Sequence, residues 1–236
     1  MAPARALLLF LLLAGPVSCH APPAREPSVR PGVNEPYFKE PQVEHWIQKL
    51  EAEDREIYTQ RKWIADQVRV LPGMTVADVG AGTGIFTLPF AEAAGPRGRV
   101  YAVDIMPNFL EHIRKQAGAA GLTNVTTVLA AEDSVKLPPS SVDLAFVCDT
   151  YHHFEYPNST LASIHRALRP SGQLIVVDFN REEGTSSKWV MDHVRAGKDR
   201  VIVEVRDAGF ELVEEVRSHN LRENYFLRFR RVVPPR

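Results

Sequence analysis

The sequence has little cysteine, which excludes the architectures that depend on it. The 236 residues include only 2 cysteines, Cys19 and Cys148, and we expect the first to be removed with an N-terminal signal. A single remaining cysteine cannot close an internal disulfide or supply a cysteine-rich metal site. Cys148 stands in an apolar run, so we predict a small core residue there.

Neither sign of charge is in excess. The chain carries 28 lysines and arginines against 29 aspartates and glutamates, a formal net charge of −1. Nucleic-acid binding favours a basic face, so we expect no nucleic-acid partner. The locally basic stretch Arg217–Arg236 is interpreted as an edge strand with solvated arginines. The length and the 44% hydrophobic fraction predict one globular domain with a sizeable core.

A long apolar run is also missing. The stretch Ala6–Gly15 is shorter than the ~20 residues that a membrane-spanning helix needs. It follows Arg5 and precedes small residues up to Cys19, a pattern typical of a cleaved signal peptide over residues 1–19. We therefore predict a secreted, lumenal or periplasmic protein with no stable membrane span after cleavage. An uncleaved anchor and lipidation of Cys19 are the alternatives, and Asn124 and Asn158 begin glycosylation sequons.

Three segments follow the signal. Proline and charge predict a flexible linker over residues 20–40. Apolar residues at helical spacing predict an N-terminal helical segment over residues 41–70, which opens a domain extending over residues 41–236. Tyr58 and Arg61 in this segment are candidates for a lid over a ligand pocket.

From residue 75 onward, apolar strands alternate with helices, which predicts an α/β domain with a mostly parallel sheet and helices on both faces. Two final strands are joined by a link so short that they must pair antiparallel. The expected strands are residues 75–79, 99–105, 125–130, 142–148, 173–179, 211–218 and 224–230, with helices at 86–94, from 107, around 161–168 and at 199–208, and a turn at 169–172.

The segment VADVGAGTGIF, residues 76–86, contains the most informative motif. Glycines between a strand and a helix let the backbone turn sharply and approach a ligand at the carboxyl edge of the sheet. Asp104 ends the next strand, where a carboxylate can accept both ribose hydroxyls of an adenosine ligand. A nicotinamide-dependent oxidoreductase is disfavoured, because the third glycine of the dinucleotide fingerprint is replaced by Ile85 or Thr87.

These segments together resemble the class I S-adenosylmethionine-dependent methyltransferases. VADVGAGTGIFTLPFA is similar to motif I of that family, VYAVDIMPNFL to the second motif, AAEDSVKLPPSSVDLAFVCDTYHHF to the third and fourth, and LRPSGQLIVVDF to the segment leading into strand five. The resemblance implies a Rossmann-like sheet of seven strands in the order 3-2-1-4-5-7-6, with the last strand antiparallel. It also implies S-adenosyl-L-methionine as the cofactor and a small molecule as the methyl acceptor.

The resemblance further implies roles for individual residues. Asp104 would hold the ribose, with Ile105 and Met106 along the adenine, and Glu132 or Asp133 near the adenine amino group. Asp149 would lie near the methionyl ammonium or the acceptor. The residues expected around the methionine moiety and adenosine are Asp78, Gly80, Ala81, Gly82, Thr83 and Gly84.

The acceptor side has fewer signals. His152 and His153 follow the fourth strand, and a histidine is suited to accept a proton near neutral pH. They are therefore the candidate catalytic residues, although either could be structural. We predict no metal site, since no third ligand at suitable spacing is evident. The sequence names neither the acceptor nor the oligomeric state, and an exported cofactor-binding protein with this fold but little activity is the alternative function.

Overall fold

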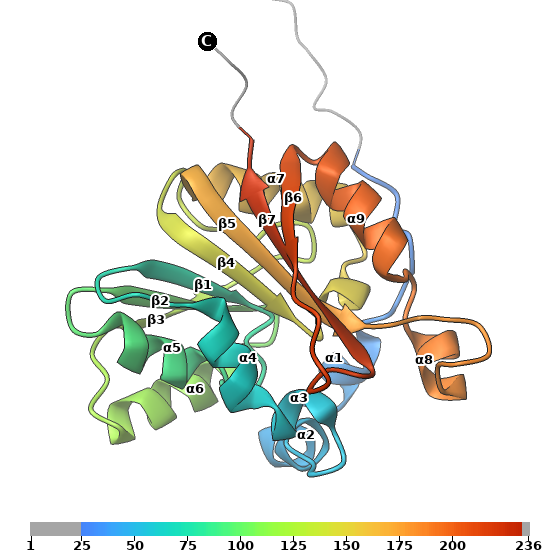
Figure 1. The fold of residues 1–236 in the computed structure, drawn as a ribbon. Coiled ribbons are helices and arrows are strands. Elements are labelled where there is room, and N and C mark those ends of the chain that lie inside the picture. Colours follow the sequence, from blue (N-terminus) through green and yellow to red (C-terminus); the bar gives the residue numbers. More distant parts are fainter. Residues whose placement is uncertain (1–24, 233–236) are drawn as a thin grey trace, which may run out of the picture.

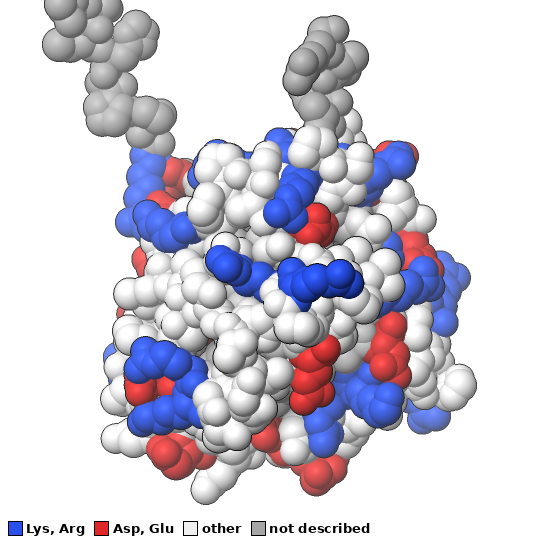
Figure 2. All heavy atoms as spheres, turned by 90° about the vertical axis from the view of Figure 1, so that its left-hand side faces the viewer, with Lys and Arg blue, Asp and Glu red and all other residues white. Residues whose placement is uncertain are grey.

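The computed structural model describes residues 25–232, and the structural statements below refer to them. The predicted signal peptide, residues 1–19, lies outside this range, as do residues 20–24 of the predicted linker. Within the described range, no helix is both long and apolar enough to cross a bilayer. Basic and acidic side chains are interspersed on the face seen in Figure 2.

A single seven-stranded sheet organises residues 25–232, in the order β3-β2-β1-β4-β5-β7-β6 (Figure 1). β7 pairs antiparallel with β5 and β6, and the other pairings are parallel. The predicted sheet order is confirmed. The strands are β1 Thr75–Val79, β2 Arg99–Asp104, β3 Val125–Leu129, β4 Val142–Cys148, β5 Leu168–Phe179, β6 Phe210–Glu215 and β7 Asn224–Arg231.

Helices cover both faces of this sheet (Figure 1). Ile64 of α4 and Phe90 of α5 pack with Val76 on one face, whereas Leu161 of α7 and Val205 of α9 belong to the cluster on the other. The helices are α1 Glu35–Lys39, α2 Val43–Leu50, α3 Glu56–Thr59, α4 Arg61–Val68, α5 Thr87–Ala94, α6 Pro107–Ala119, α7 Pro157–Ala167, α8 Lys188–His193 and α9 Lys198–Asp207, with the 3₁₀ turn η1 at Tyr151–His153.

The strand sequences account for this layering. Successive side chains of a strand point to opposite faces, so Val76 and Ala77 of β1 enter different core clusters. β4 is buried along nearly its whole length, as expected of a central strand covered on both faces. The two-sided burial fixes the register, since a slip by one residue would exchange every side chain between the layers.

The turn predicted at residues 169–172 is part of β5 instead. The register of β5 on β4 shifts between the pairs Val142–Leu168 and Leu144–Gln173, so the extra residues form a bulge. Ser171 adopts a left-handed conformation with φ 63° within it. The turn residues of the sequence thus bend a continuous strand, as bulges do.

The basic C-terminal stretch was expected on an edge strand, and this prediction is wrong for β7. β7 lies between β5 and β6, and Arg228 on it is buried. The Arg228 guanidinium donates to Glu214 Oε2 at 3.0 Å, Gln173 Oε1 at 2.8 Å and the Gln67 carbonyl at 2.7 Å. A buried arginine with several acceptors is compatible with the sheet interior, and β6 forms the edge.

Residues 25–40, predicted to belong to a flexible linker, make specific contacts with the domain. Glu155 accepts hydrogen bonds from Ser28 Oγ at 3.0 Å and from the Gly32 amide at 2.9 Å. Asn34 Nδ2 donates to the His153 carbonyl at 3.1 Å, and α1 follows directly. Composition alone predicted a flexible linker, but the buried Glu155 carboxylate accepts from two groups of this segment and joins it to the domain.

Candidate functional site

A pocket opens where β1, β2 and β4 end, and the N-terminal helices close over it. The predicted cofactor residues Asp78, Gly80–Thr83, Asp104–Met106, Glu132 and Asp149 line it, as does His153. Gly84, Asp133 and His152 do not line it. Lining residues that the sequence did not single out for this pocket are Asn34, Tyr37, Leu50, Arg55, Ile57, Val79, Ile85, Phe86, Val103, Phe109, Ala130, Ala131, Ser134, Val135, Cys148, Thr150, Phe154 and Thr160.

The glycine turn after β1 leaves no room for a side chain at Gly80. Gly80 has φ +72°, and a Cβ there would lie 2.2 Å from Thr150 Cγ2. Such a contact is impossible, and the backbone conformation itself favours glycine. The turn therefore fits directly under the first residues after β4. Gly84 has a different role, because it allows α6 to pack closely. A Cβ on Gly84 would lie 2.9 Å from Ile113 Cγ1 of α6.

Asp104 ties the second strand to this turn. Its Oδ2 accepts from the Gly82 amide at 2.9 Å and its Oδ1 accepts from the Met106 amide at 2.8 Å. Burial raises the pKa of Asp104 to about 6, although these amide hydrogen bonds oppose the shift. A carboxylate has about four acceptor positions, so both oxygens can still accept hydroxyl groups of a ligand.

Asp78 is a second buried carboxyl group in the pocket wall. Thr87 Oγ1 donates to its Oδ2 at 2.6 Å. Burial raises the pKa of Asp78 to about 7, because charged groups are poorly solvated there. Asp78 and Asp104 therefore place two carboxyl groups in the pocket wall, where they favour a cationic or hydroxyl-bearing ligand.

Asp149 directly follows β4 and adopts a left-handed conformation with φ 53°. Its Oδ2 forms an ion pair with Arg55, whereas its Oδ1 is buried and has no hydrogen-bond partner among residues 25–232. Thr83 Oγ1 is likewise buried without a partner in that range. Buried polar atoms are normally satisfied, so these two oxygens are positions for donors or acceptors of a bound molecule.

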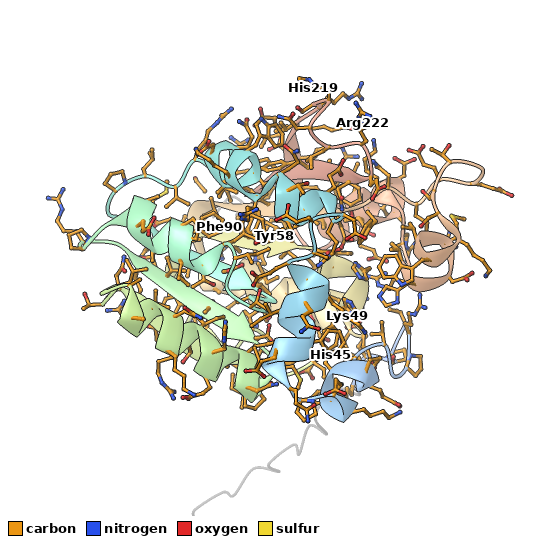
Figure 3. All side chains as sticks on the ribbon, turned by 90° about the horizontal axis from the view of Figure 1, so that it is seen from below. His45, Lys49, Tyr58, Phe90, His219 and Arg222 are labelled. Carbon is orange, nitrogen blue, oxygen red and sulfur yellow. The ribbon has the colours of Figure 1, made fainter. Side chains whose placement is uncertain are left out.

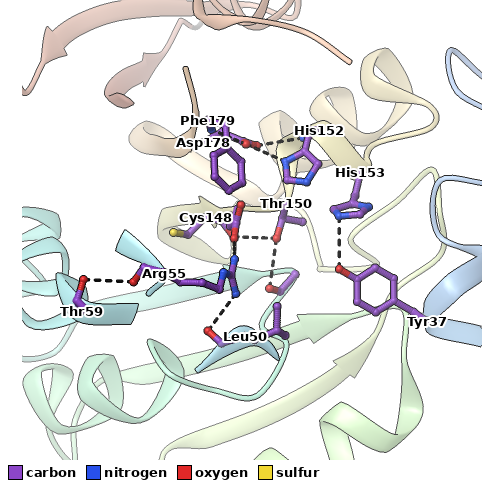
Figure 4. A network of polar contacts seen from close by, with 12 residues as sticks. Tyr37, Leu50, Arg55, Thr59, Cys148, Thr150, His152, His153, Asp178 and Phe179 are labelled. Atoms are coloured by element: carbon purple, nitrogen blue, oxygen red, sulfur yellow. Dashed lines mark hydrogen bonds and ion pairs between the residues drawn. The ribbon is translucent and has the colours of Figure 1, made fainter. Parts of the chain in front are cut away.

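The other end of the pocket is aromatic. Tyr37 of α1 stacks on Trp46 of α2, with ring centroids 4.3 Å apart, and meets Phe109 edge-on at 6.3 Å. Its hydroxyl lies 3.4 Å from His153 Nε2 (Figure 4). Burial raises the pKa of Tyr37 to about 12. The first helix thus brings a neutral hydroxyl to the histidine after β4.

The two candidate catalytic histidines differ in environment. His152 is buried, and its Nδ1 lies 2.8 Å from Asp178 Oδ1 (Figure 4). His153 lines the pocket, and burial lowers its pKa well below 6.5. Of the two, only His153 can touch a ligand in this pocket. The sequence could not separate them, because the residues are adjacent and only the 3₁₀ turn decides their directions.

Of the two acidic residues after β3, Glu132 lines the pocket and Asp133 does not. Glu132 lies 3.5 Å from Arg25 Nη2. Asp133 faces Arg25 Nε at 3.7 Å and contributes nothing to the lining. Arg25, from the segment predicted to be a flexible linker, therefore competes with any ligand for these carboxylates.

The predicted lid residues lie away from the pocket. The Arg61 guanidinium stacks over the Tyr58 ring, with Arg61 Cζ 4.0 Å from the ring centroid. Neither residue lines the site. Figure 3 shows Tyr58 in the region between the N-terminal helices and Phe90 of α5. Arg55, the residue before α3, lines the site instead and donates to the Leu50 carbonyl at 3.0 Å. No sequence signal distinguishes Arg55 from the neighbouring charged residues.

Cys148 is buried in the core cluster below the turn, as predicted, and it also borders the pocket. Burial raises its pKa well above 9.0, so the side chain is a neutral thiol at physiological pH. A thiol rather than a thiolate is a poor nucleophile. Cys148 therefore contributes shape to the pocket.

Comparison with known proteins agrees with this arrangement. Residues 77–176 match the family described as "Methyltransferase domain". Among curated proteins, the chain is 31% identical over 115 residues to a ubiquinone/menaquinone biosynthesis C-methyltransferase of Burkholderia cenocepacia, covering 49% of this chain and 47% of that protein. A protein of the same name from Shewanella is 28% identical over 153 residues, covering 63% and 61%. The chain thus spans only about half to three fifths of these relatives.

Among solved structures, the fold is similar to that of a SAM-dependent methyltransferase from Aquifex aeolicus. The TM-score is 0.69 with 25% sequence identity, and the match covers 80% of this chain and 98% of that one. The match therefore extends over nearly the whole of the compared structure and beyond the segment that carries the motifs.

Proposed function

We propose that this chain, which belongs to the class I S-adenosylmethionine-dependent methyltransferases, transfers a methyl group from S-adenosylmethionine to a small and largely apolar acceptor. One observation carries the proposal. The glycine turn, the Asp104 carboxylate and two buried oxygens without partners, Asp149 Oδ1 and Thr83 Oγ1, meet in one pocket.

The described residues fit an adenosyl ligand that carries an amino-acid end. Asp104 can accept the ribose hydroxyls while it keeps its two amide donors. Asp149 Oδ1, buried and unpartnered, suits an ammonium group, because charge-assisted hydrogen bonds are the strong ones. The Gly80–Gly82 turn lets backbone approach the ligand closely. Each feature is supplied by a different strand end.

When bound, the cofactor supplies an electrophilic methyl group on a sulfonium; the protein supplies binding and alignment. Holding reactants at ~3–3.5 Å in line accounts for much of the rate of such reactions. We assign Asp104 and Asp149 to opposite ends of the expected ligand, while Tyr37 and Phe109 line the aromatic side of the pocket. The N-terminal helices therefore complete the site.

His153 and Tyr37 are the polar groups that we assign to the acceptor. They are 3.4 Å apart and line the pocket together with Phe109 and Phe154. The lowered pKa of His153 makes it neutral at pH 7, so it acts as a hydrogen-bonding partner for the acceptor's polar atom rather than as a cation. A small apolar ring or chain with one polar substituent matches this lining.

The named relatives favour carbon as the first acceptor atom to test. They are called C-methyltransferases of ubiquinone and menaquinone biosynthesis, and we extend the reaction type to this chain as a proposal. An apolar phenol or quinol would place its ring among the aromatic residues and its hydroxyl near His153.

Binding is tested first, by isothermal titration of the purified protein with S-adenosylmethionine, S-adenosylhomocysteine and NAD. We expect affinity for the first two and none for NAD. Absence of affinity for both adenosyl ligands would overturn the proposal, and binding of NAD would favour the oxidoreductase alternative.

Turnover is tested with S-adenosylmethionine labelled in the methyl group and a panel of apolar phenols, quinols, amines and thiols. Formation of S-adenosylhomocysteine together with a labelled product identifies the acceptor, and fragmentation of that product locates the methylated atom. Cofactor binding without turnover across the panel would favour the alternative of a binding protein with this fold.

We also propose export through the N-terminal segment. The support is the sequence pattern of residues 1–19, an apolar run between Arg5 and small residues. Expression of the full chain in a secreting host, followed by mass spectrometry of the mature N-terminus, tests it. We expect a chain that begins at His20, and retention of residues 1–19 would contradict the proposal.

A further inference from the structure

Three histidines from two separate segments meet beside the pocket. His152 and His153 come from the 3₁₀ turn after β4, and His193 is the last residue of α8. Their ring centroids are 4.3 Å, 5.1 Å and 5.2 Å apart. One ring nitrogen from each lies within 4.8 Å of the other two. The third ligand that the local sequence did not provide thus comes from α8.

The hydrogen bonds leave one ring nitrogen of His152 and one of His153 without a partner in the described part of the chain. Asp178 Oδ1 lies 2.8 Å from His152 Nδ1, which leaves Nε2 as the free ring nitrogen. His153 Nε2 faces the Tyr37 hydroxyl, whereas its Nδ1 is buried and lacks a partner in the described part of the chain. A buried nitrogen without a partner needs an explanation, and a bound cation provides one.

Asp178 has the contacts of an outer-sphere residue. It is buried, and it accepts from the His152 amide at 3.1 Å and from the Phe179 amide at 2.7 Å, in addition to the His152 ring. Metal-binding histidines characteristically donate their second N–H to a carboxylate, which fixes the tautomer and the ring orientation. The His152–Asp178 pair has this form.

α8 is fixed well enough to present His193. Arg30 Nη2 donates to the Asp192 carbonyl at 2.7 Å and Arg181 Nη2 to the Met191 carbonyl at 3.0 Å. Trp189 stacks on the His193 ring, with centroids 4.6 Å apart. The Arg30 charge disfavours a nearby cation, and the buried Asp178 carboxylate offsets it.

We propose that His152, His153 and His193 bind a divalent transition-metal ion, Zn²⁺ in the first instance. Three neutral imidazoles suit Zn²⁺, Cu²⁺ and Ni²⁺ better than hard cations such as Mg²⁺. Zinc–nitrogen distances of ~2.0–2.1 Å in a tetrahedral site place the ligand atoms about 3.3 Å apart. The present spread of up to 4.8 Å requires small ring rotations. A fourth position would remain for water or an acceptor atom.

The neighbouring acidic alternative is weaker. Asp149, His152 and Asp178 also bring ligand atoms within 4.8 Å of one another. Asp149, however, is already paired with Arg55, and Asp178 already accepts from three donors. The three histidines therefore form the better donor set.

The experiment uses tag-free protein treated with a chelator and then titrated with Zn²⁺ in competition with a chromophoric chelator. We expect one equivalent to bind with a dissociation constant of ~1 µM or below. His193→Ala should weaken binding at least about 100-fold, since even outer-sphere changes cost 10–100-fold. His219→Ala, on the exposed turn between β6 and β7 (Figure 3), is the matched control and should bind like wild type.

Equal Zn²⁺ affinity in wild type and His193→Ala, or no binding by the wild type, would overturn the proposal. Co²⁺ in place of Zn²⁺ gives a second readout, because histidine coordination produces visible absorption that His193→Ala must lose. Circular dichroism confirms that each variant is folded. If His193→Ala fails to fold, His193→Gln, of similar size, carries the same expectations. The metal site does not depend on methyl transfer, so failure to bind S-adenosylhomocysteine leaves this test readable.

Discussion

Asp104 at the end of β2 accepts a 2.9 Å hydrogen bond from the amide of Gly82, in the turn after β1. The contact joins the carboxyl ends of two neighbouring strands, and it points the carboxylate into the pocket that both strands line. Asp104 and Gly82 thereby form one side of the proposed cofactor site, and the site can be tested at each of its parts.

The first prediction concerns the ribose contact. Asp104→Ala should raise the dissociation constant for S-adenosylhomocysteine at least about tenfold, because it removes charge-assisted hydrogen bonds. Asp133→Ala is the matched control: this carboxylate faces Arg25 outside the pocket, and its loss should change affinity little. Titration calorimetry measures both. Unchanged affinity in a folded Asp104→Ala protein would reject the ribose assignment.

The second prediction concerns pH. The pKa of Asp104 is about 6 because of burial, and the ionised carboxylate is the better acceptor. Affinity for S-adenosylhomocysteine should therefore fall as the pH drops below about 6, by at most about tenfold per pH unit. The dissociation constant is measured between pH 5 and 8. Asp104→Asn should remove this part of the dependence, and an identical profile in the variant would contradict the assignment.

The third prediction concerns stability. Asp78 titrates near pH 7 in the folded protein, against 3.8 for an unperturbed carboxyl. The folded state therefore holds a proton that the unfolded state releases, and stability falls as the pH rises from about 4 to 7. Asp78→Asn should gain ~1 kcal/mol or more at pH 8, since one pKa unit corresponds to ~1.4 kcal/mol.

Thermal unfolding at several pH values measures this gain, which should shrink towards pH 4. Asp66→Asn is the control, because that carboxylate is exposed on α4 and, among residues 25–232, pairs with Lys62 alone. A variant that is less stable than wild type at pH 8 would show that burial of the Asp78 charge costs little.

The fourth prediction concerns the turn. A Cβ on Gly80 would collide with Thr150, whereas Gly121, with a similar φ of +69°, has no atom of the described residues within 4 Å of its Cβ position. Both alanine variants pay the backbone strain of a left-handed residue, ~1–2 kcal/mol. Only Gly80→Ala must also displace Thr150. We expect Gly80→Ala to lose cofactor binding and Gly121→Ala to keep it, as measured by calorimetry. Equal behaviour of the two would show that the turn tolerates a side chain.

The fifth prediction concerns the ordered N-terminal segment. Glu155→Ala removes the acceptor for Ser28 and for the Gly32 amide. Hydrogen exchange of residues 28–37 should accelerate at least about tenfold, since protection follows the local opening free energy. Glu183→Ala, an exposed position, should leave that exchange unchanged. Equal exchange in both variants would mean that other contacts hold the segment.

Local sequence patterns were sufficient for most of the secondary structure. The sheet is predicted by the alternation of apolar strands with helices and by the glycine turn. Its antiparallel strand is predicted by the short final link, because a short connection between strands permits only antiparallel pairing. α8 was missed, since its 6 residues, KWVMDH, are too few for a helical period to show.

The residues of the site likewise fall into those that the sequence predicted and those that only the structure revealed. The sequence determined the glycine turn, Asp104 and the residues after β4, because each is adjacent in the chain to the strand end that positions it. Only the tertiary structure decided that Tyr37 and Arg55 close the pocket, that His153 rather than His152 faces it, and that His193 joins both histidines. These contacts cross long stretches of chain, and packing rather than local conformation brings their residues together.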